Sequence, residues 1–217
     1  QGNTQRLLTE WERCNKEGSD LLITPEMYLC GYPPQDLLER NSFIDQMEVA
    51  VQYLRHESRR FSRCGLLVGT AVRDHKIPGK GLINAAILIY EGNILHIQGK
   101  SLLPTYDVFD ERRYFDPAVH PQTVAFKGLR LGISICEDAW NADEFWKGKL
   151  PYDTDPIAIL AQQEAELLIN MSASPFHRGK DTLRLKLLQW HARRHQIPFV
   201  WVNQVGGNDE LLFDGNS

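Results

Sequence analysis

The stretch LRLGISICEDAW, residues 129–140, carries the clearest strand pattern in the chain. Within Leu131–Ile135, large apolar residues alternate with small ones, and this period of two predicts a strand with one apolar face. Cys136 ends the strand on its small-residue face. The acids Glu137 and Asp138 follow, as is typical of the start of a helix or turn, whose backbone N–H groups favour a bound anion.

Working outward from this strand, similar short apolar runs alternate with helical patterns along the chain. The predicted strands are residues 21–24, 66–72, 84–90, 94–98, 123–126, 167–170 and 199–203. The predicted helices are residues 4–17, one or two helices from a cap at Asp36 to about 61, 156–166, and one carrying Leu183, Leu187 and Trp190. Residues 101–121 lack a pattern and indicate a loop. This alternation predicts an α/β fold in a single domain spanning 1–217, because no linker or repeat divides the chain.

Composition excludes several classes of protein. The net charge is -4 and the pI about 6.0, with cations scattered among acids, so no nucleic-acid partner is expected. The sequence contains no apolar run of 18 residues, so no membrane span is expected either. The four cysteines form no CxxC pair. We therefore expect a cytoplasmic protein with reduced thiols.

Three separated residues suggest chemistry when they are considered together. Taken alone, Cys136 is explained as a small buried apolar residue. Taken alone, Glu26 and Lys100 are explained as solvated surface charges. However, each follows a predicted strand, where a side chain is held rigidly. Attack of a thiol on an amide requires a base to remove the thiol proton and a donor to stabilise the oxyanion. A cysteine, a glutamate and a lysine can supply those roles.

Four motifs resemble the series found in nitrilase-superfamily amidases: TPEMYLCGYPPQDLL, KSLLPTYDVFDERRYF, LGISICEDAW and NMSASPFHRGK. The full sequences of these motifs, together with NQVGGNDELLFDG, are similar to the glutaminase domain of bacterial glutamine-dependent NAD synthetases. The similarity runs through nearly the whole chain. The resemblance implies an αββα four-layer sandwich, which the alternation alone would not distinguish from a doubly wound sheet.

The same resemblance implies a role for each matching residue. Cys136 would be the nucleophile, Glu26 the proton acceptor and Lys100 the oxyanion-stabilising cation. Glu111 would be a second carboxylate, and the backbone N–H of Glu137 an oxyanion donor. The implied contacts to the glutamine substrate are Tyr106, Ser174 and Lys180.

The implied reaction releases ammonia from L-glutamine through a Cys136 thioester. A synthetase domain would use the ammonia to amidate deamido-NAD. We expect that domain, the family's first strand and its closing segment to lie outside residues 1–217. No cofactor is expected for the glutaminase step, whereas ATP and magnesium would serve only the synthetase domain. A homo-oligomer is also expected.

Three alternatives remain open from the sequence. A stand-alone carbon-nitrogen hydrolase acting on another amide or carbamoyl compound would use the same residues. A non-catalytic oligomerisation module would need none of them. A metal enzyme is suggested by His191 and His195, which are spaced i, i+4. However, we expect both near a helix C-terminus, where a histidine interacts favourably with the helix dipole. No bound metal is predicted.

Overall fold

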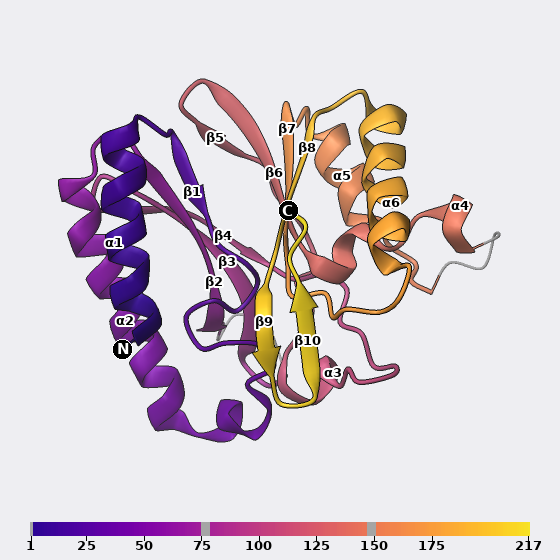
Figure 1. Ribbon diagram of the computed structural model, residues 1–217, viewed down its shortest axis with the longest axis horizontal. Coiled ribbons are helices and arrows are strands. Elements are labelled where there is room, and N and C mark those ends of the chain that lie inside the picture. The colour runs from indigo at the N-terminus through magenta and orange to yellow at the C-terminus, as the bar shows by residue number, and fades with distance from the viewer. Residues whose placement is uncertain (1, 75–78, 147–150) are drawn as a thin grey trace.

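Two four-stranded sheets lie face to face with helices on their outer sides in the computed structural model (Figure 1). The structure describes residues 2–74, 79–146 and 151–217. The longer helices are α1 (Gly2–Glu17), α2 (Asn41–Glu57), α5 (Pro156–Gln162) and α6 (Lys180–His195). Short helical turns are η1 (Gln35–Glu39), η2 (Ser58–Arg60), α3 (Glu111–Tyr114), η3 (Cys136–Ala139) and α4 (Asp143–Trp146).

The first sheet has the strand order β1-β2-β3-β4. Its strands are β1 (Leu21–Ile23), β2 (Gly65–Arg73), β3 (Leu82–Tyr90) and β4 (Asn93–Gly99). The β1 and β2 strands run parallel, and the other neighbours are antiparallel. Glu91 and Gly92 form the predicted hairpin turn between β3 and β4, both with positive φ, as a two-residue hairpin of the primed type requires.

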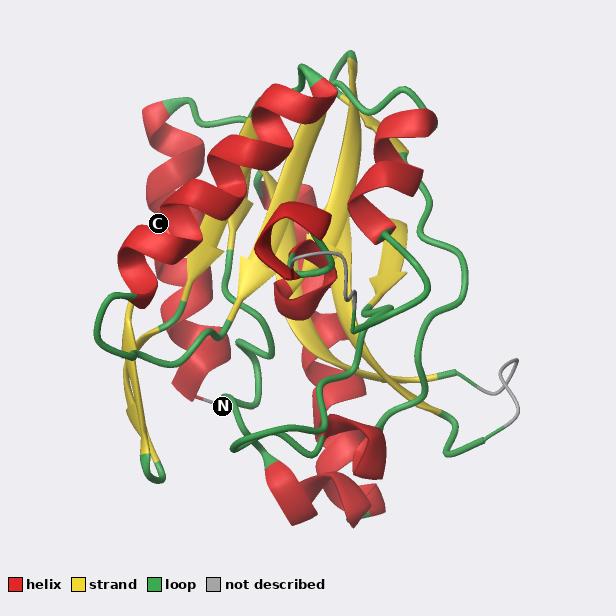
Figure 2. Ribbon diagram, turned by 90° about the vertical axis from the view of Figure 1, so that its right-hand side faces the viewer, coloured by secondary structure: helices red, strands yellow, loops and turns green. Residues whose placement is uncertain are grey.

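The second sheet has the order β5-β6-β7-β8. Its strands are β5 (Val124–Phe126), β6 (Leu129–Ile135), β7 (Leu167–Ser172) and β8 (Phe199–Asn203). The β6, β7 and β8 strands are parallel, so their carboxyl ends lie at one edge of the sheet. Helices α5 and α6 connect them, and Figure 2 views the molecule from this helical side.

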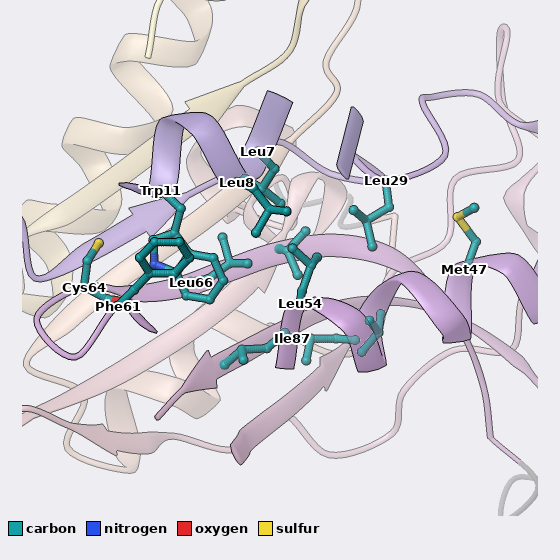
Figure 3. Packing of buried hydrophobic residues seen from close by; sticks show 13 residues of the cluster. Leu7, Leu8, Trp11, Leu29, Met47, Leu54, Phe61, Cys64, Leu66 and Ile87 are labelled. Carbon is teal, nitrogen blue, oxygen red and sulfur yellow. The ribbon is translucent and has the colours of Figure 1, made fainter. Parts of the chain in front are cut away.

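The hydrophobic core has three layers of contact, which together define an αββα sandwich. Between α1, α2 and the first sheet, Trp11 is fully buried against Leu54, Leu66 and their neighbours (Figure 3). Between the sheets, Leu88 of β3 belongs to the same cluster as Ile133 of β6. A third cluster joins α5 and α6 to β7. Burial of each such side chain stabilises the fold by about 1.5–3 kcal/mol. The expected four-layer fold is confirmed.

Local differences from the sequence expectations have simple causes. Asp36 does not cap a helix, since η1 begins after Pro34 and Asp36 instead accepts a hydrogen bond from Tyr114. The segment expected to be only a loop contains α3. Helix α5 ends at Gln162, before the predicted residue 166. On α6, Leu183 is exposed and Arg184 is buried, because Arg184 forms an ion pair with Asp214.

Besides α3, the sequence did not predict α4 or the hairpin of β9 (Val205–Asn208) and β10 (Leu211–Asp214). The hairpin extends away from both sheets (Figures 1 and 2). Among the helices described, none combines the length and the apolar character needed to cross a bilayer.

Candidate active site

Lys100 lies at the centre of a buried group of charges. It follows β4 directly, is about 1% exposed, and its Nζ lies 2.8 Å from Glu26 Oε1 and 2.7 Å from Glu111 Oε1. Burial alone would lower the pKa of Lys100, but the charges of Glu111 and Glu26 outweigh it and raise the pKa well above its usual value. The two carboxylates therefore favour the charged form of the ammonium.

Two residues separate Glu26 from the end of β1, and three hydrogen-bond donors hold its carboxylate. Besides Lys100, its Oε1 accepts a hydrogen bond from Asn84 Nδ2 at 2.7 Å, and its Oε2 accepts one from the backbone N–H of Ala173 at 3.0 Å. Gly69 allows this segment to approach β2, because a Cβ there would lie 2.5 Å from a backbone oxygen of the segment. The carboxylate is therefore fixed in one position between the two sheets.

Glu111 begins α3 and is the second carboxylate on the lysine. Its Oε1 also accepts a hydrogen bond from the Tyr32 hydroxyl at 2.8 Å. Burial raises the pKa of Glu111 to about 7, while the Lys100 charge opposes the shift and Glu26 adds to it. One ammonium thus serves two carboxylates, and burial disfavours the ionisation of Glu111.

Cys136 stands at the junction of β6 and η3. Its φ of 42° lies in the left-handed region, which is unusual for a residue with a side chain and is typical of strained functional turns. Burial raises the pKa of the thiol, the Glu26 charge raises it further, and the Lys100 charge lowers it. The resting group is therefore a protonated thiol within the electrostatic reach of both a base and a cation.

A cavity of about 550 Å3 opens next to the thiol. Its lining includes five of the sequence-predicted residues, namely Tyr106, Cys136, Glu137, Ser174 and Lys180. Aromatic side chains, Phe109, Trp140, Phe145 and Trp146, form much of the rest. A larger cavity of about 810 Å3 along α1 and α2 contains none of the predicted residues. The 550 Å3 cavity is therefore the candidate substrate site.

The cavity is lined by both acidic and basic side chains, and Glu137 and Lys180 act on each other's pKa. The Tyr106 hydroxyl donates to both carboxylate oxygens of Glu137 at 2.9 Å, and Tyr152 donates to one at 3.1 Å. Burial raises the pKa of Glu137, and Lys100 and the two phenols oppose this. Opposite in charge, Lys180 lies 5.8 Å from the ring centroid of Trp140, and burial lowers its pKa.

The remaining predicted positions also lie at the site. Ser174 is buried, with its backbone N–H donating to Asn203 Oδ1 at 2.8 Å. Glu137 is the second residue of η3, so its backbone N–H belongs to the first turn, where N–H groups have no partner within the helix. The structure thus brings together all eight predicted residues: Lys100 with its two carboxylates, and five residues that line the cavity.

Four contributors were missed by the sequence reasoning. Asn84 carried a detectable signal, because it is a polar residue inside the apolar strand Leu82–Tyr90. Tyr32 lies in the recognised Gly-Tyr-Pro-Pro turn, but nothing indicated that its hydroxyl reaches Glu111. Ala173 acts through its backbone, and Tyr152 lies outside every predicted element, so neither left a pattern to detect.

The histidine pair of α6 follows the sequence prediction in part, because His195 is the last residue of the helix. His191 is fully buried instead of lying at the helix end, and its Nε2 is 2.7 Å from the backbone oxygen of Ala139. Burial lowers its pKa to about 4, so it is neutral and not a partner of the helix dipole. Within residues 2–74, 79–146 and 151–217, no group of three or more potential ligands could hold a metal ion.

Comparison with known proteins agrees with this geometry. The family model described as carbon-nitrogen hydrolase matches residues 1–217. Glutamine-dependent NAD(+) synthetases of Synechocystis and Thermotoga maritima are 43% and 37% identical over 99% and 100% of this chain. The chain spans only 38% and 35% of their lengths.

Solved structures give the same picture. The glutamine-dependent NAD+ synthetase of Acinetobacter baumannii superposes with a TM-score of 0.84 at 29% identity, covering 99% of this chain and 37% of that one. A nitrilase-superfamily amidase from Nesterenkonia has a TM-score of 0.78 at 22% identity over 99% of this chain and 74% of its own, and shares the fold. The family match over the whole chain and these relatives lead to one conclusion: the chain belongs to the carbon-nitrogen hydrolase family.

Proposed function

We propose that this chain hydrolyses the side-chain amide of L-glutamine, as the glutaminase portion of a glutamine-dependent NAD synthetase. The observation that carries the proposal is the buried Lys100 held between Glu26 and Glu111 beside the Cys136 thiol, at a cavity lined by both acidic and basic side chains. The names of the relatives supply the choice of glutamine.

In the first half of the reaction, Glu26 removes the proton of Cys136 and the sulfur attacks the amide carbon. Lys100 and the backbone N–H of Glu137 stabilise the oxyanion. The intermediate collapses as the C–N bond breaks, and Glu26 returns its proton to the leaving nitrogen, which departs as ammonia. A γ-glutamyl thioester remains. Because the resting thiol is protonated, base catalysis is required and contributes about 10²- to 10⁴-fold.

In the second half, Glu26 removes a proton from water, and the resulting hydroxide attacks the thioester carbon. The C–S bond breaks, the sulfur takes up the proton, and glutamate leaves. Glu111 supports both halves by fixing the ammonium at 2.7 Å, so that Lys100 is held by a second carboxylate while Glu26 accepts and returns protons. Every group returns to its starting protonation state.

The cavity suits the two charged groups of an amino acid. Glu137, held by the Tyr106 and Tyr152 hydroxyls, would take the substrate ammonium. Lys180 would take its carboxylate, and Ser174 would add a hydrogen bond. The aromatic walls would cover the methylene groups. These assignments orient the amide toward Cys136.

The wider proposal concerns what surrounds this step. The glutaminase step needs no cofactor, whereas ATP and magnesium act in the synthetase domain that accepts the ammonia. Residues 1–217 form one domain of a larger cytoplasmic homo-oligomer. The four free cysteines support a reducing compartment, because cytosolic thiols are kept reduced.

The Cys136→Ala variant tests the proposal in the protein with its synthetase domain. Glutamine-driven NAD formation should be lost, while formation driven by free ammonia should survive. Cys14→Ala is the matched control, since Cys14 is half-buried among core residues of α1. Glutamine-driven formation by Cys136→Ala would overturn the proposal.

Two further measurements separate the alternatives. A stand-alone amidase would turn over other ω-amides or carbamoyl compounds at least as fast as L-glutamine. An oligomerisation module would leave Cys136 unlabelled by a glutamine-like electrophile, whereas the proposed enzyme should be labelled rapidly and in one-to-one ratio.

A further inference from the structure

The carboxylate of Asp138 lies between the two segments that carry the reacting groups. It is about 1% exposed and belongs to η3. Its Oδ1 accepts hydrogen bonds from the backbone N–H groups of Ser101 at 3.0 Å and Leu102 at 2.9 Å. Its Oδ2 accepts one from the backbone N–H of Ile135 at 2.9 Å. One side chain thus binds the residues just after Lys100 and the residue just before the nucleophile.

These two segments come from different sheets. Lys100 follows β4 of the first sheet, and Cys136 follows β6 of the second. A shift of one sheet against the other would change the distance from the ammonium to the reacting sulfur. A displacement of about 1 Å at a reacting centre can lower the rate about 100-fold. A tie between the two segments therefore bears directly on the reaction.

Both oxygens of Asp138 are needed as acceptors. An asparagine has a single accepting oxygen, so its NH2 group would face either the two N–H groups after Lys100 or the N–H of Ile135. Burial raises the pKa of Asp138 to about 7, and the N–H groups of Ile135 and Leu102 oppose this shift. Hydrogen bonds that oppose protonation bind the ionised form more strongly. The tie is therefore specific to a carboxylate.

We propose that Asp138 is a positioning residue that fixes the ammonium of Lys100 relative to the thiol of Cys136 by tying the ends of the two sheets together. The proposal rests on the proposed function for its effect on turnover. Asp138 touches backbone only, and it acts through the two residues that it positions.

The test compares Asp138→Asn with the wild type in the full chain. We expect kcat for L-glutamine to fall about 100-fold with KM within about twofold. We also expect the pH midpoint for alkylation of Cys136 by iodoacetamide, followed by peptide mass spectrometry, to rise. The reason is that Lys100, whose charge lowers the thiol pKa, would no longer be held close to Cys136, although Glu26 and Glu111 still bind it.

Asp116→Asn is the matched control, because Asp116 is also buried and its Oδ2 accepts from the backbone N–H of Gly81 at 2.7 Å. It should keep kcat and the alkylation midpoint. If Asp138→Asn does not fold, Asp138→Glu replaces it, since its two oxygens still accept but its longer side chain displaces the two segments, so that kcat should still fall and the midpoint still rise. An unchanged kcat and midpoint in the folded Asp138 variant, or equal changes in the control, would overturn the proposal.

The two proposals fail separately. If the wild type releases no ammonia from L-glutamine, the proposed function fails. The alkylation midpoint still decides whether Asp138 positions Lys100, because iodoacetamide needs no substrate site.

Discussion

The floor and the wall of the site are built differently. We call Glu26, Lys100, Glu111 and Cys136 the floor, and Tyr106, Glu137, Ser174 and Lys180 the wall. On the floor, the charged groups are at most 6% exposed and contact one another at 2.7–2.8 Å. On the wall, Glu137 and Ser174 are also buried, but Tyr106 is 46% exposed and Lys180 is half-buried.

This difference indicates a separate task for each region: the floor carries out the chemistry, and the wall binds the ligand. Burying three charges costs several kcal/mol per ion unless they pair closely, so a buried charged group is retained where the chemistry needs it. Wall residues need only meet a ligand that brings its own charges. Floor substitutions should therefore change kcat, and wall substitutions KM.

The largest effect is expected for Glu26→Gln. The amide cannot accept the thiol proton, so kcat should fall about 10²- to 10⁴-fold while KM changes little. Single-turnover ammonia release measures this directly. Glu166→Gln is the control. Glu166 is also a carboxylate that accepts from a backbone N–H, that of Arg130, but at the opposite end of β6 from Cys136. A normal kcat in Glu26→Gln would place the base elsewhere.

Lys100→Met should lower kcat about 10²- to 10³-fold by removing an oxyanion donor. It should also destabilise the fold by about 3–5 kcal/mol, because two carboxylates stay buried without their cation. Urea unfolding measures the second effect. Adding Glu111→Gln should restore part of the stability and none of the activity. Equal stability of both variants would contradict the shared-cation arrangement.

On the wall, Lys180→Met should raise KM for L-glutamine about 10- to 100-fold with kcat nearly unchanged, since a charge-assisted hydrogen bond contributes about 1.5–3 kcal/mol. Steady-state kinetics separates the two constants. Lys186→Met, on an exposed position of the same helix, should change neither. If kcat alone fell, Lys180 would act in the chemical reaction and would belong to the floor.

The smallest effect concerns pH. The pKa of Glu111 is raised from 4.5 to about 7 by burial, so the folded protein holds this proton more tightly than the unfolded chain. Its contribution to stability is full below pH 4.5 and is lost as the pH rises to about 7. The stability difference between wild type and Glu111→Gln should therefore shrink over that range in urea titrations. A difference that grows with pH would reverse the assignment.

Local periodicity was sufficient to predict most of the fold. The strands around Ile133 and Leu88 and the helix around Trp11 follow from their spacing of apolar residues. The stacking of two sheets did not follow from spacing, and came from the resemblance to a family. The hairpin β9–β10 was missed because its first strand, Val205–Asn208, is exposed at every position and has no apolar face to detect.

The site divides in the same way. Glu26, Lys100 and Cys136 could be proposed because each follows a strand and matches a motif. The supporting hydrogen bonds of the site could not be proposed, since Ala173 donates a backbone N–H to Glu26, and Tyr152 reaches Glu137 from a segment without regular structure. Such contacts depend on how distant segments dock, which single-sequence patterns do not encode.

The hydrogen bond from Ala173 N–H to Glu26 spans 147 residues and joins the ends of the two sheets. During folding, contacts so distant in sequence require large loops to close and therefore tend to form late. A chain with only one sheet assembled holds its cysteine as an ordinary thiol. Recovery of ammonia release from L-glutamine during refolding would therefore report the docking of the two halves, because Glu26 and Cys136 come from different sheets.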